Sequence, residues 1–113
     1  MNNFEELQEN IIAWAEEKDL LHEENSEKQF MKVIEEIFEF KTVFDFKRLR
    51  NRKGSIVLNR NLILEMGDIF VTLIILCEQL NISPQTCLAM AYDKIKARKG
   101  KTINGTFVKE QDL

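Results

Sequence analysis

The stretch Asn61-Leu62-Ile63-Leu64-Glu65-Met66-Gly67-Asp68-Ile69-Phe70-Val71-Thr72-Leu73-Ile74-Ile75-Leu76-Cys77-Glu78-Gln79-Leu80 decides the fold. Wound at 3.6 residues per turn, it is apolar around nearly its whole circumference, and such a helix is buried. We therefore predict a central helix from about Asn61 to Leu80. A chain of 113 residues cannot easily cover this helix on every side. We expect a homodimer or homotetramer in which a second copy covers the remaining faces.

Three more helices are predicted around this one from apolar periodicity and capping residues. The first runs from Phe4 to Leu21 with Asn3 as N-cap, the second from Ser26 to Lys47 with Ser26 and Gln29 as a capping box, and the last from Pro84 to Lys99 with Ser83 as N-cap. The predicted fold class is all-α, a four-helix-bundle-like arrangement with the second and third helices antiparallel.

Two segments outside these helices are predicted from their composition. Residues 48–60 are basic and contain Gly54, which indicates a loop. Gly100 is placed to end the last helix. The basic tail, residues 101–113, contains the turn signal Asn104-Gly105, and Thr106 to Val108 is expected to be extended.

The composition is that of one globular domain over residues 1–113. Hydrophobic residues make up 44% and charged residues 31%, which excludes wholesale disorder. One proline and four glycines leave too few turn signals for a sandwich or barrel. No apolar run approaches the roughly 20 residues of a membrane span. Without a basic, apolar leader at Met1, and with Cys77 and Cys87 at no metal spacing, we expect a cytoplasmic location and no membrane partner.

The net charge of −3 conceals an uneven distribution along the chain. Residues 1–39 carry 12 acids and 3 bases, whereas residues 40–113 carry 7 acids and 13 bases. Basic clusters beside acidic helices suit a ligand that bears phosphates. Taken alone, each cluster is more commonly explained by solvated helix ends and loops.

Two pairs of carboxylates stand out on the central helices. Glu65 and Asp68 are three residues apart within the narrow polar stripe of the third helix, and Glu36 and Glu39 have the same spacing on the second. Neighbouring carboxylates repel each other, and a divalent cation removes that penalty. Mg²⁺ takes hard oxygen ligands, and helical bundles build such sites from facing helices. The spacing therefore predicts a Mg²⁺ site, with Mn²⁺ as an alternative ion.

At these residues the sequence resembles the MazG-like family of all-α nucleoside triphosphate pyrophosphohydrolases. The family pattern Glu-Glu-x-x-Glu followed by Glu-x-x-Asp corresponds to Glu35-Glu36-Ile37-Phe38-Glu39 and Glu65-Met66-Gly67-Asp68. The break at residues 81–84 and the basic tail resemble those of small members of the family, so the resemblance covers about residues 26–110. Phe38 departs from the pattern, which usually has a small residue there; its ring would crowd the site or reshape the base pocket.

The resemblance implies Mg²⁺-dependent hydrolysis of nucleoside triphosphates to monophosphate and pyrophosphate. Water would attack the α-phosphate, and the reaction would serve to clear non-standard or surplus nucleotides. Metal ligands would be Glu36, Glu39, Glu65 and Asp68, with Glu35 orienting or deprotonating the water. Phosphate contacts would come from Lys94, Arg98, Lys101, Asn104 and Lys109.

Two aromatic residues are candidates for contact with a nucleotide base. Trp14 or Phe30 is a candidate to stack on the base, although each is more commonly a core residue.

One alternative function is a non-catalytic helical interaction protein whose acidic stripe is merely solvated. Another is a nucleic-acid-binding protein, against which stand the overall acidity and the lack of a recognisable motif; we expect no stable nucleic-acid partner.

Overall fold

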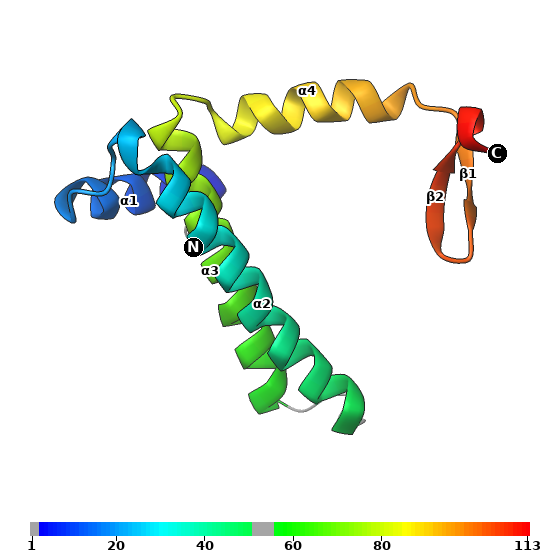
Figure 1. Cartoon of the computed structure of the whole chain (residues 1–113), viewed down its shortest axis with the longest axis horizontal. Helices are drawn as coiled ribbons and strands as arrows, with labels where there is room; N and C mark the ends of the chain where they lie inside the picture. Colours follow the sequence, from blue (N-terminus) through cyan, green and yellow to red (C-terminus); the bar gives the residue numbers. More distant parts are fainter. Residues whose placement is uncertain (1–2, 51–55) are drawn as a thin grey trace. The chain divides into compact units, whose positions relative to one another are not determined.

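The computed structural model describes residues 3–50 and 56–113, and it is mostly helical. Its contacts divide the chain into two compact units, residues 1–82 and 83–113. The first unit contains α1 (Phe4–Glu17), the 3₁₀ helix η1 (Glu23–Asn25), α2 (Ser26–Arg50) and α3 (Ile56–Gln79). The second contains α4 (Pro84–Lys96), strands β1 (Gly100–Ile103) and β2 (Thr106–Lys109), and the 3₁₀ helix η2 (Glu110–Asp112). Figure 1 shows these elements.

The first unit is built on an antiparallel pair of long helices. α2 and α3 lie side by side along their length, and α1 packs against α3. Among the side chains that the structure describes, the buried apolar residues are Ala15 of α1, Val33 of α2, and Ile74 and Ile75 of α3. They come from α1, the N-terminal half of α2 and the C-terminal half of α3, so the described part of the core lies where these three segments meet. The predicted antiparallel pairing of the second and third helices agrees with this arrangement.

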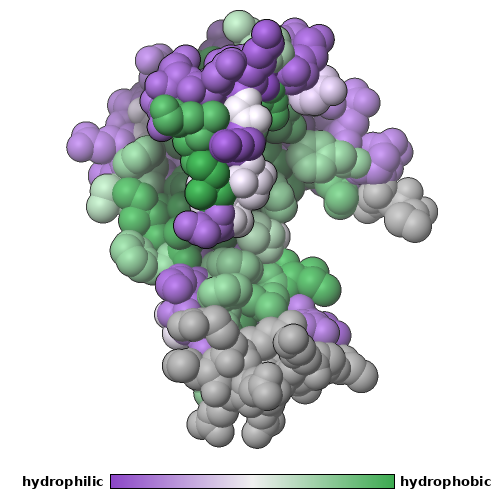
Figure 2. Space-filling model, turned by 90° about the vertical axis from the view of Figure 1, so that its right-hand side faces the viewer, coloured by the Kyte–Doolittle hydropathy of each residue, from purple (hydrophilic) through white to green (hydrophobic). Residues whose placement is uncertain are grey.

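The single chain leaves much of the apolar surface of α2 and α3 uncovered. Ile63 is 71% exposed, Phe38 67% and Phe70 51%. Green, hydrophobic surface is prominent on the face of the molecule in Figure 2. The sequence led us to expect α3 to be buried on all sides, and within one chain it is not. Within the first unit, α1 and α2 pack against α3 and leave part of its apolar surface exposed. The excess of apolar residues on this helix was the reason for predicting an oligomer.

Helix starts are set by the predicted caps at two places. The Asn3 side chain accepts a hydrogen bond from the backbone N–H of Glu6 at 2.8 Å. Ser83 accepts one from the backbone N–H of Thr86 at 3.3 Å, and Pro84 follows at the first helical position. These short polar side chains satisfy N–H groups that have no partner inside the helix. The expected break before α4 is therefore confirmed.

The predicted capping box at Ser26 is wrong. Ser26 has helical dihedral angles, φ −63° and ψ −33°, because η1 leads directly into α2. The Gln29 side chain instead donates from Nε2 to the carbonyl oxygen of Thr72 on α3, at 3.1 Å. This glutamine therefore joins two helices rather than closing the start of one.

Several predicted helix limits also shift. α1 ends at Glu17 rather than Leu21, since Asp19 adopts a left-handed φ of 59°. α2 continues to Arg50 and α3 already begins at Ile56, so helix occupies both ends of the predicted basic loop. The middle of that loop, residues 51–55, lies outside the described residues.

The second unit contains a hairpin in the tail, where a turn at Asn104-Gly105 and an extended Thr106 to Val108 were predicted. β1 and β2 pair antiparallel, with Gly100 opposite Lys109 and Ile103 opposite Thr106. Asn104 and Gly105 form the two-residue turn with φ of 51° and 80°, the left-handed values that this dipeptide favours. α4 ends at Lys96, so Gly100 does not cap it. Gly100 begins β1 instead, where an added Cβ would collide with the backbone oxygen of Val108.

Candidate functional site

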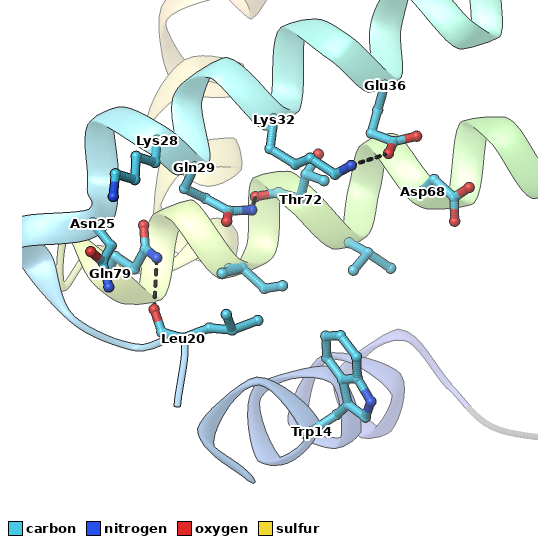
Figure 3. A pocket seen from close by; sticks show the side chains of 12 residues that line it. Trp14, Leu20, Asn25, Lys28, Gln29, Lys32, Glu36, Asp68, Thr72 and Gln79 are labelled. Carbon is cyan, nitrogen blue, oxygen red and sulfur yellow. Dashed lines mark hydrogen bonds and ion pairs between the residues drawn. The ribbon is translucent and has the colours of Figure 1, made fainter. Parts of the chain in front are cut away.

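A cavity of about 660 Å³ opens in the first unit between α1, α2 and α3. Its size is in the range of small-molecule sites in proteins. The lining residues are Trp14, Leu20, Asn25, Lys28, Gln29, Lys32, Glu36, Asp68, Val71, Thr72, Ile75 and Gln79. Figure 3 shows the carboxylates of Glu36 and Asp68 at one end of the cavity and the amides of Asn25 and Gln79 at the other. The Trp14 indole lies across from α2 and α3. The cavity thus combines an anionic end, an apolar wall and an amide end.

Three acidic side chains converge at the anionic end. Glu36 of α2 and Glu65 and Asp68 of α3 each place one carboxylate oxygen so that these atoms lie within 4.8 Å of one another. Glu36 is only 7% exposed, while Asp68 is exposed. The i, i+3 spacing puts Glu65 and Asp68 on one face of α3, and the antiparallel pairing brings Glu36 opposite them. Three such oxygens can hold a divalent cation, although the set by itself does not select Mg²⁺.

Two oxygens of this cluster are buried without a partner in the described part of the chain. They are Oε2 of Glu36 and Oε2 of Glu65. A buried polar atom without a hydrogen bond is costly, and native proteins rarely leave one unsatisfied. A cation between the carboxylates would satisfy both atoms and neutralise their mutual repulsion.

Glu39 stands beside the cluster rather than within it. Its pKa is raised above the ordinary value, chiefly because its carboxyl group hydrogen-bonds with that of Glu36 and also because the Glu36 charge opposes its ionisation. The charges of Glu65 and Glu35 act in the same direction. Three of the four predicted ligands therefore converge, and the fourth is electrostatically coupled to them.

Lys32 supplies the cationic neighbour that our sequence reasoning missed. Its ammonium group lies 3.3 Å from Oε1 of Glu36 and 3.5 Å from Oε2 of Glu35. The pKa of Lys32 is raised, chiefly by its hydrogen bond to Glu36 and then by the Glu35 charge. The available signal was its position four residues before Glu36, which places both on one helical face.

Glu35, the predicted catalytic residue, occupies a different position from Glu36. Its side chain is 59% exposed and paired with Lys32, and it is absent from the cavity lining. Adjacent residues on a helix point about 100° apart, which explains why only one of the two faces the cavity. A catalytic role for Glu35 stays a prediction.

Only one of the two aromatic candidates for base stacking lines the cavity. Trp14 lines the cavity, whereas Phe30 is 53% exposed and lines none of it. Phe38, expected to crowd the site, is likewise outside the lining and 67% exposed.

The five predicted phosphate contacts all belong to the second unit. Lys94 and Arg98 come from α4 and the residues just after it, and Lys101, Asn104 and Lys109 from the hairpin. Within that unit, Arg98 and Lys109 line one shallow cavity together with Lys99 and Glu110. Their predicted contact with a triphosphate stays a prediction.

No family model matches the chain, and neither a curated protein nor a solved structure matches it. The resemblance to MazG-like enzymes therefore rests on the acidic motifs, the break at residues 81–84 and the tail. Among the described helices, none has both the length and the apolar content needed to cross a bilayer.

Proposed function

We propose that the protein is a divalent-metal-dependent hydrolase that cleaves nucleoside triphosphates to the monophosphate and pyrophosphate. The observation that carries the proposal is the convergence of Glu36, Glu65 and Asp68, two of them with buried oxygens that have no partner among the described residues. This cluster borders a cavity that also contains an indole. Carboxylates can bind a metal, an aromatic surface can stack on a base and nearby cations can contact phosphates, so the cavity offers a group for each part of a nucleotide.

We assign the chemical roles to side chains that line the cavity and to carboxylates beside it. Glu36, Glu65 and Asp68 would hold Mg²⁺ or Mn²⁺, with Glu39 completing the set once it loses its proton. Such an ion would screen the phosphate charge and lower the pKa of a bound water. Lys32, already at 3.3 Å from Glu36, is placed to contact a phosphate oxygen. Glu35 would orient or deprotonate the attacking water, and Trp14 would stack on the base.

The rival function, an interaction protein with a solvated acidic face, fits the burial less well. A solvated carboxylate is exposed and satisfied by water, whereas Glu36 is 7% exposed and one of its oxygens is unpartnered within the described structure. The lack of a helix-turn-helix or aromatic-basic signature also leaves the nucleic-acid alternative without support.

The test is replacement of Asp68 by asparagine, with pyrophosphate release and thermal melting as readouts. An amide is nearly isosteric but binds a divalent cation poorly. We expect Asp68→Asn to lose about a hundredfold or more in activity. The metal-free variant should melt at or above the parent temperature because repulsion within the cluster is relieved. Mg²⁺ should raise the melting temperature of the parent and much less that of the variant.

Asp93→Asn is the matched control, since Asp93 is an exposed aspartate paired with Lys96 in the second unit. It should keep both the activity and the metal-induced shift. Equal metal shifts in the parent and Asp68→Asn would show that Asp68 is not a ligand. Undetectable hydrolysis of every nucleoside triphosphate by the parent would favour the interaction protein.

We also propose that a second copy of the chain covers the exposed apolar surface of α2 and α3. Ile63, Leu64 and Phe70 are each more than half exposed, an arrangement that an isolated helix pair rarely maintains in water. Light scattering at micromolar concentration should give the mass of a dimer or tetramer. A monomer of 13.3 kDa would contradict this.

A further inference from the structure

The amide end of the cavity contains a buried acceptor with no role in the metal site. Gln79, the last residue of α3, is 6% exposed and lines the cavity. Its Nε2 donates to the backbone carbonyl of Leu20 at 2.8 Å. Its Oε1 is buried and has no partner among the described residues. A helix of the core therefore ends in an acceptor that none of the described residues satisfies.

The orientation of this amide is set by its neighbour. If the nitrogen and oxygen were exchanged, two carbonyl oxygens would face each other at hydrogen-bonding distance, which is repulsive. The Leu20 carbonyl thus fixes Nε2 on its own side. In Figure 3 the remaining oxygen of Gln79 is directed away from Leu20, toward the side of the cavity where Lys28 stands.

The position of Gln79 matches the far end of a nucleotide held at the carboxylates. Asp68 and Gln79 are eleven residues apart on one helix, so about 16 Å of helix axis separates them. The Gln79 side chain leans toward the helix N-terminus, so its amide lies closer to Asp68 than the axial separation alone indicates. A nucleoside with its phosphates spans a distance of this order. Between the two ends, Val71 and Ile75 provide an apolar wall and Trp14 an aromatic one.

We propose that Oε1 of Gln79 is a base-selecting acceptor that favours nucleotides whose base carries an amino group at position 6 of a purine or position 4 of a pyrimidine, namely those of adenine and cytosine. The amino group at position 6 of adenine or position 4 of cytosine projects from the base edge and donates hydrogen bonds. Hypoxanthine and uracil present a carbonyl oxygen at the same positions, which would face Oε1 acceptor to acceptor. A site with a fixed buried acceptor discriminates strongly against a ligand that leaves it unpaired.

This inference rests on the proposed function for the position of the phosphates, but the two can fail separately. The experiment compares substrates that differ only in amino against carbonyl: dATP with dITP, and dCTP with dUTP. In the parent we expect kcat/KM to favour the amino member of at least one pair by about tenfold or more. No variant is needed for this arm, so a folding defect cannot obscure it.

The variant arm is Gln79→Met, which keeps the length of the side chain and removes the acceptor. It should reduce the amino-over-carbonyl ratio to near one. Gln29→Met is the matched control, because Gln29 also lines the cavity and also donates to a backbone carbonyl, that of Thr72. Both variants lose a hydrogen bond to a backbone carbonyl, so Gln29→Met should lower the melting temperature about as much as Gln79→Met does. The amino-over-carbonyl ratio of kcat/KM should stay at the parent value in Gln29→Met.

Three outcomes would overturn the inference. These are a parent with no preference in either pair, a preference for the carbonyl members, and a preference that survives Gln79→Met. Each would mean that Oε1 accepts from a trapped water or serves only to orient the amide toward Leu20. If no triphosphate is hydrolysed, the proposed function has failed. The melting shift produced by dAMP against dIMP then tests Gln79 directly, and equal shifts would overturn it.

Discussion

The two units of the chain are stabilised in different ways. The first buries Ala15, Val33, Ile74 and Ile75, and polar side chains from one segment bond to the backbone of another, as Gln29 and Gln79 do. The second has no buried residue, and Leu88, Met90 and Tyr92 of α4 are each more than 60% exposed. Its structure depends on local features: the Ser83 cap and the Asn104-Gly105 turn. Long-range packing therefore defines the first unit, and short-range signals define the second.

The largest expected difference between the units is in the free energy of unfolding lost when one aliphatic side chain in each is replaced by alanine. Ile74 is 5% exposed, and Ile74→Ala removes buried methyl groups and leaves a cavity, so we expect a loss of about 2–5 kcal/mol in unfolding free energy. Leu88 is 65% exposed, and Leu88→Ala should change it by less than about 0.5 kcal/mol. Urea unfolding monitored by circular dichroism measures both. A large loss for Leu88→Ala would show that α4 is packed against a surface, in this chain or in another copy.

Removal of the hairpin should separate substrate binding from stability. Truncation after Gly100 deletes Lys101, Asn104 and Lys109, and nothing deleted is part of the buried core. We expect KM for the triphosphate to rise several-fold, as loss of exposed phosphate contacts does. The melting temperature should change by only a few degrees. Gly100→Ala, whose added Cβ collides with the Val108 backbone, should reproduce the KM effect without removing any residue. A large melting loss with unchanged KM would place the tail in the structural core.

Acidification should weaken metal binding in the first unit through Glu39. The pKa of Glu39 is raised, so it holds a proton at a pH where an ordinary glutamate has lost it. A carboxyl group with a raised folded pKa destabilises the metal-free protein once it ionises, so stability without metal should fall as pH rises from the ordinary value through the raised one. Mg²⁺ affinity should fall over the same window as pH decreases. In Glu39→Gln, the pH dependence of metal-free stability and that of Mg²⁺ affinity should both flatten, as calorimetric titration at several pH values would measure. If both remain as in the parent, Glu39 does not interact electrostatically with the cluster.

The smallest effect concerns an exposed pair in the link between α1 and η1. The pKa of His22 is raised, chiefly by its hydrogen bond to Asp19 at 2.6 Å. A histidine with a raised folded pKa contributes stability that is complete below its unfolded pKa and is lost as pH rises through the folded value. Asp19→Asn tolerates the left-handed φ of 59° and removes the charge. The melting difference between parent and Asp19→Asn should therefore be larger near about pH 5.5 than near about pH 9. A difference that is independent of pH would show that the pair does not form.

Local patterns were sufficient for the parts of the fold that depend on adjacent residues. The caps Asn3 and Ser83 and the Asn104-Gly105 turn follow from short-range chemistry, and the structure contains all three. The hairpin itself was only half anticipated, because pairing of β1 with β2 requires Gly100 to act as a strand residue rather than a cap. The acidic spacings on α2 and α3 likewise identified three carboxylates that converge. The caps, the turn and the i, i+3 spacing within each helix follow from local periodicity, which determines which neighbours share a face.

Only the tertiary structure decided how side chains from different helices are used. It assigned Gln29 to the Thr72 carbonyl rather than to a cap, and Gln79 to Leu20. It placed Trp14 but not Phe30 at the cavity, and it left Glu39 beside the carboxylate cluster rather than in it. The sequence by itself determined which residues lie on each helical face, since that follows from 3.6 residues per turn. Which faces meet depends on the axial offset and rotation of packed helices, and these are set by the summed packing of many side chains rather than by any local motif.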